Sequence, residues 1–137
     1  MLTNTQQNDY KGEIVVSKVY GYCRTALASE EDIIQRTELI KRYCEDNGLS
    51  LDKCFCDNGV SGFDIGEGFK QLMHELENGD ILVVRDISQL SRMNSRLLML
   101  IEQFNNMGVK VMYVVGDGGD ISSIEQWINE RIIRQQY

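Results

Sequence analysis

The expected fold is decided by the stretch Lys18-Val-Tyr-Gly-Tyr-Cys-Arg-Thr-Ala26, near the start of a chain of 137 residues. An apolar, aromatic run leads directly to Arg24, and the pattern of a loop and then a helix follows it. The run predicts a strand near residues 18–22. In an open α/β sheet, ligands bind beyond the carboxyl ends of the strands. Arg24 is therefore the first candidate for a functional residue.

Strand and helix patterns alternate along the rest of the sequence. Ser29-Glu-Glu-Asp32 has the form of a capping box, which predicts that a helix begins there. The spacing of apolar residues predicts further helices over 69–76 and 94–107, and further strands over 51–56, 81–84 and 110–115. This alternation predicts an α/β fold, with a mainly parallel central sheet of about four to five strands flanked by helices.

The ends of the chain differ in character from its centre. Residues 1–17 form a polar N-terminal extension, and residues 18–120 are expected to form the α/β domain. The glycine-rich segment Gly116–Asp120 is interpreted as a linker. Residues 121–137 predict a short amphipathic helix, whose apolar stripe suits either the core or a dimer surface.

The charge balance is acidic, with 14 lysines and arginines against 21 aspartates and glutamates, a net charge of −7. Proteins that bind phosphate backbones are usually basic, so this chain alone is expected to bind DNA weakly. No apolar run approaches the roughly 18 residues of a membrane span, and no secretory signal begins the chain. We therefore expect a cytoplasmic protein without membrane contact.

Four cysteines occur, at positions 23, 44, 54 and 56. None of them forms the C-x-x-C pair that is typical of a zinc ribbon or a thioredoxin-like site. Cys54 and Cys56 share one face of an expected strand, and Cys23 lies on another strand. Buried reduced thiols are the favoured interpretation, with zinc as the lesser alternative. No metal and no cofactor are expected.

Several short motifs occur together in one order. They are Gly21-Tyr22-x-Arg24, Asp57-x-Gly-x-Ser61-Gly62, Gly79-Asp80 and Leu90-Ser91-Arg92. Through these motifs the segment over residues 18–115 resembles the N-terminal catalytic domain of the serine recombinases, the resolvase/invertase family. In that family a serine oxygen attacks a DNA phosphodiester and forms a phosphoserine link, while clustered arginines hold the phosphate.

The sequence departs from the family pattern at four positions. The resemblance places Ala26 at the position of the nucleophilic serine. It also places Gly66 and Gln89 where the family has arginines, and Ser88 where it has an aspartate. The candidates for phosphate binding that remain are Arg24, Arg92 and Ser61.

Three functional hypotheses follow. The favoured one is a recombinase-like domain that cannot cleave DNA and serves as a regulatory or dimerising module, or is the remnant of a mobile element. The second is an active recombinase that uses another hydroxyl, such as that of Ser29. The third is an unrelated α/β domain that binds phosphate or a small molecule. In each case Arg24 and Arg92 could instead be surface arginines in ordinary ion pairs.

The resemblance also implies partners. Family members act on DNA as dimers, so DNA and either a second copy or a partner recombinase are expected. The family usually continues with a long helix and a separate DNA-binding domain. With a short helix over 121–137, no such separate domain is expected in this chain.

Overall fold

The computed structural model describes residues 17–115 and 118–120, which form a sheet of five strands flanked by helices. The order of strands across the sheet is β2-β1-β3-β4-β5. The first four strands run parallel, and β5 pairs antiparallel with β4. The strands are β1 (Val19–Thr25), β2 (Lys53–Asn58), β3 (Ile81–Val84), β4 (Lys110–Tyr113) and β5 (Gly119–Asp120).

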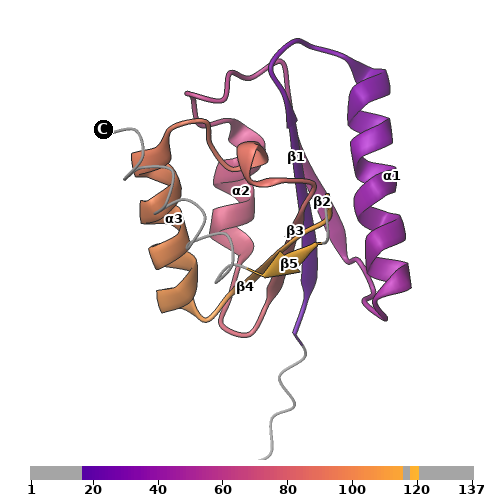
Figure 1. The fold of residues 1–137 in the computed structure, drawn as a ribbon, viewed down its shortest axis with the longest axis vertical. Coiled ribbons are helices and arrows are strands. Elements are labelled where there is room, and N and C mark those ends of the chain that lie inside the picture. The colour runs from indigo at the N-terminus through magenta and orange to yellow at the C-terminus, as the bar shows by residue number, and fades with distance from the viewer. Residues whose placement is uncertain (1–16, 116–117, 121–137) are drawn as a thin grey trace, which may run out of the picture.

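The helices cover both faces of this sheet (Figure 1). Helix α1 (Glu30–Asp46) lies on one face, and α2 (Glu67–Glu75) and α3 (Asn94–Met107) lie together on the other. A short 3₁₀ helix, η1 (Ile87–Gln89), follows β3. Parallel neighbours such as β1 and β3 need long crossover connections, and the helices supply them.

Successive side chains of β1 point to opposite faces of the sheet, so the core consists of two layers. Tyr20 and Tyr22 point into the larger cluster, which contains the apolar faces of α2 and α3. Val19 and Cys23 point the other way, into a smaller cluster closed by Ile40 of α1. Arg24 follows the same alternation as the tyrosines. Its side chain therefore belongs to the α2 and α3 side of the sheet.

The predicted α/β class and the mainly parallel sheet are confirmed. The end predicted for the first strand is wrong, because β1 continues through Arg24 to Thr25, which pair with Asp57 and Asn58 of β2. The segment Gly116–Asp120 is also more than a linker, since Gly119 and Asp120 form β5. The N-terminal extension, apart from Ser17, and the helix expected over 121–137 lie outside the described residues.

Local signals set the helix ends as expected. Helix α1 begins after Ser29, whose hydroxyl accepts a hydrogen bond from the Asp32 amide at 3.2 Å. Helix α3 ends at Gly108, which has a φ of 75°. Glycine adopts this left-handed conformation without the steric cost that other residues pay.

Candidate functional site

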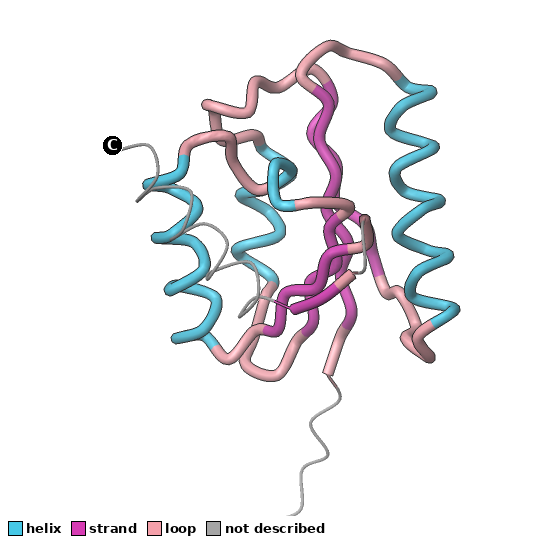
Figure 2. The backbone as a smooth tube through the Cα atoms, viewed as in Figure 1, coloured by secondary structure: helices cyan, strands magenta, loops and turns pink. Residues whose placement is uncertain are grey.

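The candidate site lies at the carboxyl ends of β1, β2 and β3. Figure 2 shows the loops that follow β1 and β2 side by side at the top of the molecule. Backbone hydrogen bonds join these two loops, because the amides of Gly59 and Val60 both donate to the carbonyl of Thr25, at 2.8 and 2.9 Å. The topology therefore brings the first two motifs of the sequence to one edge of the sheet.

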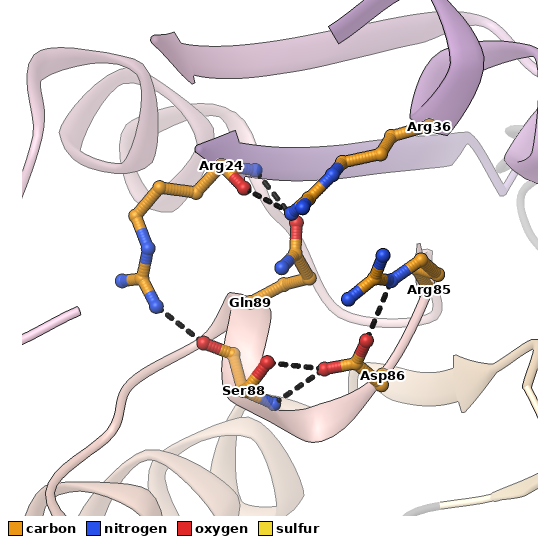
Figure 3. A network of polar contacts seen from close by, with 6 residues as sticks. All are labelled: Arg24, Arg36, Arg85, Asp86, Ser88 and Gln89. Carbon is orange, nitrogen blue, oxygen red and sulfur yellow. Dashed lines mark hydrogen bonds and ion pairs between the residues drawn. The ribbon is translucent and has the colours of Figure 1, made fainter. Parts of the chain in front are cut away.

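Arg24 is held within this edge rather than on the surface, with 5% of its area exposed. Its amide donates to Oε1 of Gln89 at 2.7 Å, and its guanidinium donates to the carbonyl oxygen of Ser88 (Figure 3). The Arg36 side chain from α1 donates to the carbonyl of Arg24. Burial lowers the pKa of Arg24, and the nearby charge of Arg92 acts in the same direction. Arg24 is thus a desolvated cation.

Arg24 and Arg92 converge on Gly62. A Cβ atom at Gly62 would lie 2.2 Å from Cγ of Arg92 and 3.1 Å from Nη2 of Arg24. The amide of Arg92 also donates to the carbonyl of Gly62 at 2.9 Å. Only a residue without a side chain fits between the two arginines. Among residues 17–115 and 118–120, none of the ion pairs includes either arginine, so ordinary ion pairing does not account for them.

Asp57 is a buried carboxylate whose role the sequence did not reveal. It accepts hydrogen bonds from the Tyr22 hydroxyl at 2.6 Å and from the amides of Gly68 and Phe69 at 2.8 and 2.9 Å. Burial and the hydrogen bond to Asp57 raise the pKa of Tyr22. Asp57 therefore lies in β2 and caps α2 through these two amides.

The residue at the start of α2 explains why the helix needs this cap. The N-cap residue of α2 is Gly66, which has no side chain to satisfy the first amides of the helix. A Cβ atom at Gly66 would lie only 2.2 Å from Cγ of Asp57. Asp57 therefore occupies the space beside Gly66, where the resemblance places a family arginine.

The segment between β3 and α3 contains the other two altered positions. Gln89, 3% exposed, is occupied by its bond to the Arg24 amide. The amide and hydroxyl of Ser88 both donate to the Asp86 carboxylate, the former at 2.9 Å. Nε of Arg85 donates to the same carboxylate at 2.6 Å. Although burial opposes it, hydrogen bonds from Ser88 and Arg85 hold the pKa of Asp86 below its usual value.

The hydroxyl candidates and Ala26 lie around the rim of the site. Ala26 is exposed in the loop between β1 and α1. Ser29 caps α1, and its amide donates to Oδ1 of Asn58 at 2.8 Å. Ser61 accepts a hydrogen bond from the amide of Phe63 at 3.1 Å, as a residue that shapes a loop does. In this arrangement the oxygen atoms of Ser29 and Ser61 serve the local backbone.

A cavity of about 390 Å³ opens beside Arg24, between α2 and α3. Sequence patterns did not predict it, because its walls come from three separate segments, residues 22–24, 64–69 and 90–103. Arg96 lies at its edge and donates to the carbonyl of Phe63 at 3.0 Å. Its walls include Tyr22, Phe69, Leu90 and Met99 along with Arg24 and Arg96.

In the described part of the chain, the only group of three metal-ligating side chains consists of Cys23, Cys54 and Cys56, on the sheet face that α1 covers. No helix in the ranges that the structure describes has the length and apolar character needed to cross a bilayer.

Comparison with known proteins places these features in a family. Residues 19–133 match the family description "Resolvase, N terminal domain". The chain is 24% identical over 110 residues to the Tn3 transposon resolvase of Escherichia coli, a match covering 78% of this chain and 57% of that protein. It is 28% identical over 98 residues to a resolvase/recombinase of Pseudomonas putida, a match covering 71% of this chain and 51% of that protein. The chain thus spans about half the length of the curated relatives it matches.

Solved structures share the fold. The N-terminal catalytic domain of the TP901-1 integrase superposes with a TM-score of 0.73 at 22% identity, covering 88% of this chain and all of that one (100%). A resolvase family site-specific recombinase from Streptococcus pneumoniae gives a TM-score of 0.62 at 21% identity, covering 88% of this chain and 93% of that one. Since the sheet, the order of motifs and the match over residues 19–133 agree, the chain belongs to the resolvase N-terminal domain family of the serine recombinases.

Proposed function

We propose that this chain is a serine-recombinase-type domain that takes part in DNA recombination or in the movement of mobile elements without cutting DNA itself. The observation that carries the proposal is Ala26. It follows β1 at the position where the family has its nucleophile, and it is exposed at the candidate site. Covalent cleavage of a phosphodiester needs an oxygen with a lone pair at this position. A methyl group has none.

The neighbouring hydroxyls do not replace the missing one. Thr25 is 3% exposed, and its hydroxyl donates to Oδ1 of Asn58 at 2.7 Å. The oxygen of Ser29 caps α1. Moving Ser29 towards a substrate would remove that cap, at a cost of about 1 kcal/mol. The local structure thus favours a site without a nucleophile over one with a substitute.

The remaining cations support binding rather than catalysis. The stem of Arg92 and the guanidinium of Arg24 both border Gly62, and the charge of Arg92 acts to lower the pKa of Arg24. Two neighbouring guanidinium groups suit a phosphate. Gly66 adds no positive charge, and the side chain of Gln89 is committed to the Arg24 backbone. Stabilising the charge of a phosphoryl transition state takes several positioned donors. The site has kept the groups for holding a phosphate and lost those for reacting with it.

The proposed partners are DNA and a second recombinase subunit, either another copy of this chain or an intact family member. The net charge of −7 gives this chain little affinity for a polyanion by itself. Its contribution would then be assembly with a subunit that supplies more DNA contacts. No observation favours the unrelated α/β domain over this assignment.

The experiment that tests the proposal is a covalent-adduct assay. The full chain would be incubated with a labelled pool of nicked duplexes of randomised sequence, since the target site is unknown, and with supercoiled plasmid. Protein–DNA adducts would be resolved under denaturing conditions. The variants are Ala26→Ser and Ser29→Ala, and an intact serine recombinase on its own site and on the pool is the positive control. We expect no adduct from the unaltered chain.

An adduct from the unaltered chain that disappears in Ser29→Ala would overturn the proposal and identify Ser29 as the nucleophile. Phosphate binding is tested separately by the thermal stabilisation that inorganic phosphate produces. We expect Arg92→Gln to reduce this stabilisation, and Arg42→Gln, which alters an exposed arginine on α1, to leave it unchanged. Equal stabilisation of both variants would refute a phosphate site at Arg92.

A further inference from the structure

The strand register brings three cysteines together on the sheet face that α1 covers. In the β1–β2 pair, Cys23 lies directly opposite Cys56, and Gly21 lies opposite Cys54. Cys54 and Cys56 are two residues apart in β2, so both side chains point to the same face. The three Sγ atoms all lie within 4.8 Å of one another. We refer to Cys23, Cys54 and Cys56 as the thiol cluster.

Two neighbours shape the thiol cluster. Gly21 leaves room for it, because a Cβ atom there would lie 3.0 Å from Sγ of Cys54. Thr37 of α1 lies above it, with its hydroxyl oxygen 3.6 Å from Sγ of Cys23 and 3.9 Å from Sγ of Cys56. Cys23 is fully buried, whereas Cys54 and Cys56 are partly exposed. The cluster is therefore enclosed, yet open on the β2 side.

The separations match those of sulfur atoms around one metal ion. Metal–thiolate bonds of about 2.3 Å place three sulfurs in a trigonal set about 4 Å apart. Here the Cys23 and Cys56 sulfurs are 3.1 Å apart, and every pair is within 4.8 Å. Side-chain shifts of less than about 1 Å would equalise these distances.

We propose that the thiol cluster binds a soft, thiophilic metal ion through three thiolates, and that Cu(I) is the ion it suits best. Soft thiolate sets select ions of this kind. Each thiol that becomes a ligand releases its proton to solvent. The cluster lies on the opposite face of the sheet from the Arg24 side chain, and the proposal does not depend on the function proposed above.

The donor set decides between Cu(I) and zinc. Structural zinc is almost always bound by four ligands in a tetrahedron. Within the residues that the structure describes, no fourth histidine, cysteine or carboxylate joins the cluster. The hydroxyl oxygen of Thr37, 3.6 Å from Sγ of Cys23, is neutral and a poor zinc ligand. The set thus favours an ion that accepts three sulfurs over one that needs a complete tetrahedron.

Cys44 provides a matched control. It is a buried cysteine of α1 that packs in the same apolar layer but is not a member of the thiol cluster. The full chain and single Cys→Ala variants at positions 23, 44, 54 and 56 would be reduced under anaerobic conditions. Each would then be titrated with Cu(I) against the chelator bicinchoninate, and separately with Zn(II).

We expect the unaltered chain and Cys44→Ala to bind a single equivalent of Cu(I), and to bind Zn(II) more weakly. Loss of any ligand in the cluster is expected to weaken Cu(I) binding at least tenfold, since the loss of even an outer-shell partner costs about this much. Melting curves of the metal-free variants report whether they fold. Cys→Ser variants, which preserve side-chain size, replace any alanine variant that does not.

Thiol alkylation read by mass spectrometry gives a second measurement. Cu(I) is expected to protect Cys23, Cys54 and Cys56 from iodoacetamide while leaving the reactivity of Cys44 unchanged. The proposal is overturned if the reduced chain leaves Cu(I) with the chelator, or if Cys44→Ala weakens binding as much as the cluster variants do. It is also overturned if Zn(II) is retained through gel filtration and Cu(I) is not.

Discussion

Replacing Gly66 with alanine tests how the site is built. The backbone at Gly66 has a φ of −85° and a ψ of 165°, which any residue can adopt. At such a position Gly→Ala normally stabilises a protein by about 0.4–1 kcal/mol, because it reduces the entropy of the unfolded chain. The surroundings reverse this expectation, since the new methyl would lie 2.2–2.4 Å from the carboxylate of Asp57.

The size of the effect follows from what Asp57 does. Ordinary contact between heavy atoms begins near 3.5 Å, so the carboxylate must move by about 1 Å or more. The two hydrogen bonds that it accepts from backbone amides at the start of α2 are worth about 1–2 kcal/mol, as for an N-cap. Leaving the buried Tyr22 hydroxyl without its partner costs about 1–3 kcal/mol. We therefore expect Gly66→Ala to lower the free energy of unfolding by about 2–4 kcal/mol.

Urea denaturation measures this change. With a slope of about 2 kcal/mol per molar urea, the middle of the range for small proteins, the midpoint should fall by roughly 1–2 M. The control is a double-mutant cycle with Asp57→Ala, which removes the carboxylate. In that background Gly66→Ala should be neutral or slightly stabilising, so its effect changes sign. A penalty that persists without Asp57, or an unchanged midpoint for Gly66→Ala alone, would refute the reasoning.

The same steric argument applies to restoring the family arginine. Gly66→Arg places a Cβ atom in the same space as Gly66→Ala does. It is therefore expected to destabilise the chain at least as much. Adding Ala26→Ser would supply a hydroxyl, but it would not make room for that arginine. Recovery of the family site thus requires Asp57 to move as well.

Three further predictions concern other parts of the site. Ser29→Ala should lower the free energy of unfolding by about 1 kcal/mol through loss of the α1 cap, measured by urea denaturation; an unchanged midpoint would contradict this role. Gln89→Arg should destabilise the chain by about 2 kcal/mol or more, because it leaves the Arg24 amide without its acceptor and adds a second cation beside a buried one. Gln89→Glu, which keeps the acceptor oxygen, should cost less in the same assay, and the reverse order would refute the explanation. The pKa of Asp86 is depressed in the folded state, because the carboxylate accepts hydrogen bonds from Ser88 and Arg85. These bonds therefore stabilise the chain above a pH of about 4, and their contribution disappears as the pH falls through the lowered pKa of the folded state. Asp86→Asn should therefore lower the melting temperature at pH 7 and have little effect near pH 2; a constant difference between these pH values would contradict the assignment.

The sequence by itself determined the class of fold. Hydrophobic periodicity and helix caps are local signals, so the alternation of strands and helices could be predicted from neighbouring residues. As predicted, α1 begins after Ser29, and α3 spans Asn94–Met107. The order of motifs was also enough to predict the resemblance to serine recombinases, which the family match confirms.

Only the tertiary structure decided what surrounds each candidate residue. Gly62 could be recognised as part of a motif, but its position between Arg24 and Arg92 depends on two loops that are distant in sequence. Gln89 was counted as a lost cation, yet its carbonyl oxygen serves the Arg24 amide across 65 residues. These contacts depend on how β1, β2 and β3 are ordered and paired, which no local pattern encodes.

The thiol cluster shows the same division. The sequence placed Cys54 and Cys56 on one face of a strand, because side chains alternate with a period of two. It could not place Cys23 opposite Cys56, since that depends on the register of a parallel pair joined by a helix. The short antiparallel strand β5 was likewise hidden in a glycine-rich segment, where pairing with β4 and not residue preference makes the strand. Local preferences determined the elements, and long-range pairing determined which side chains meet.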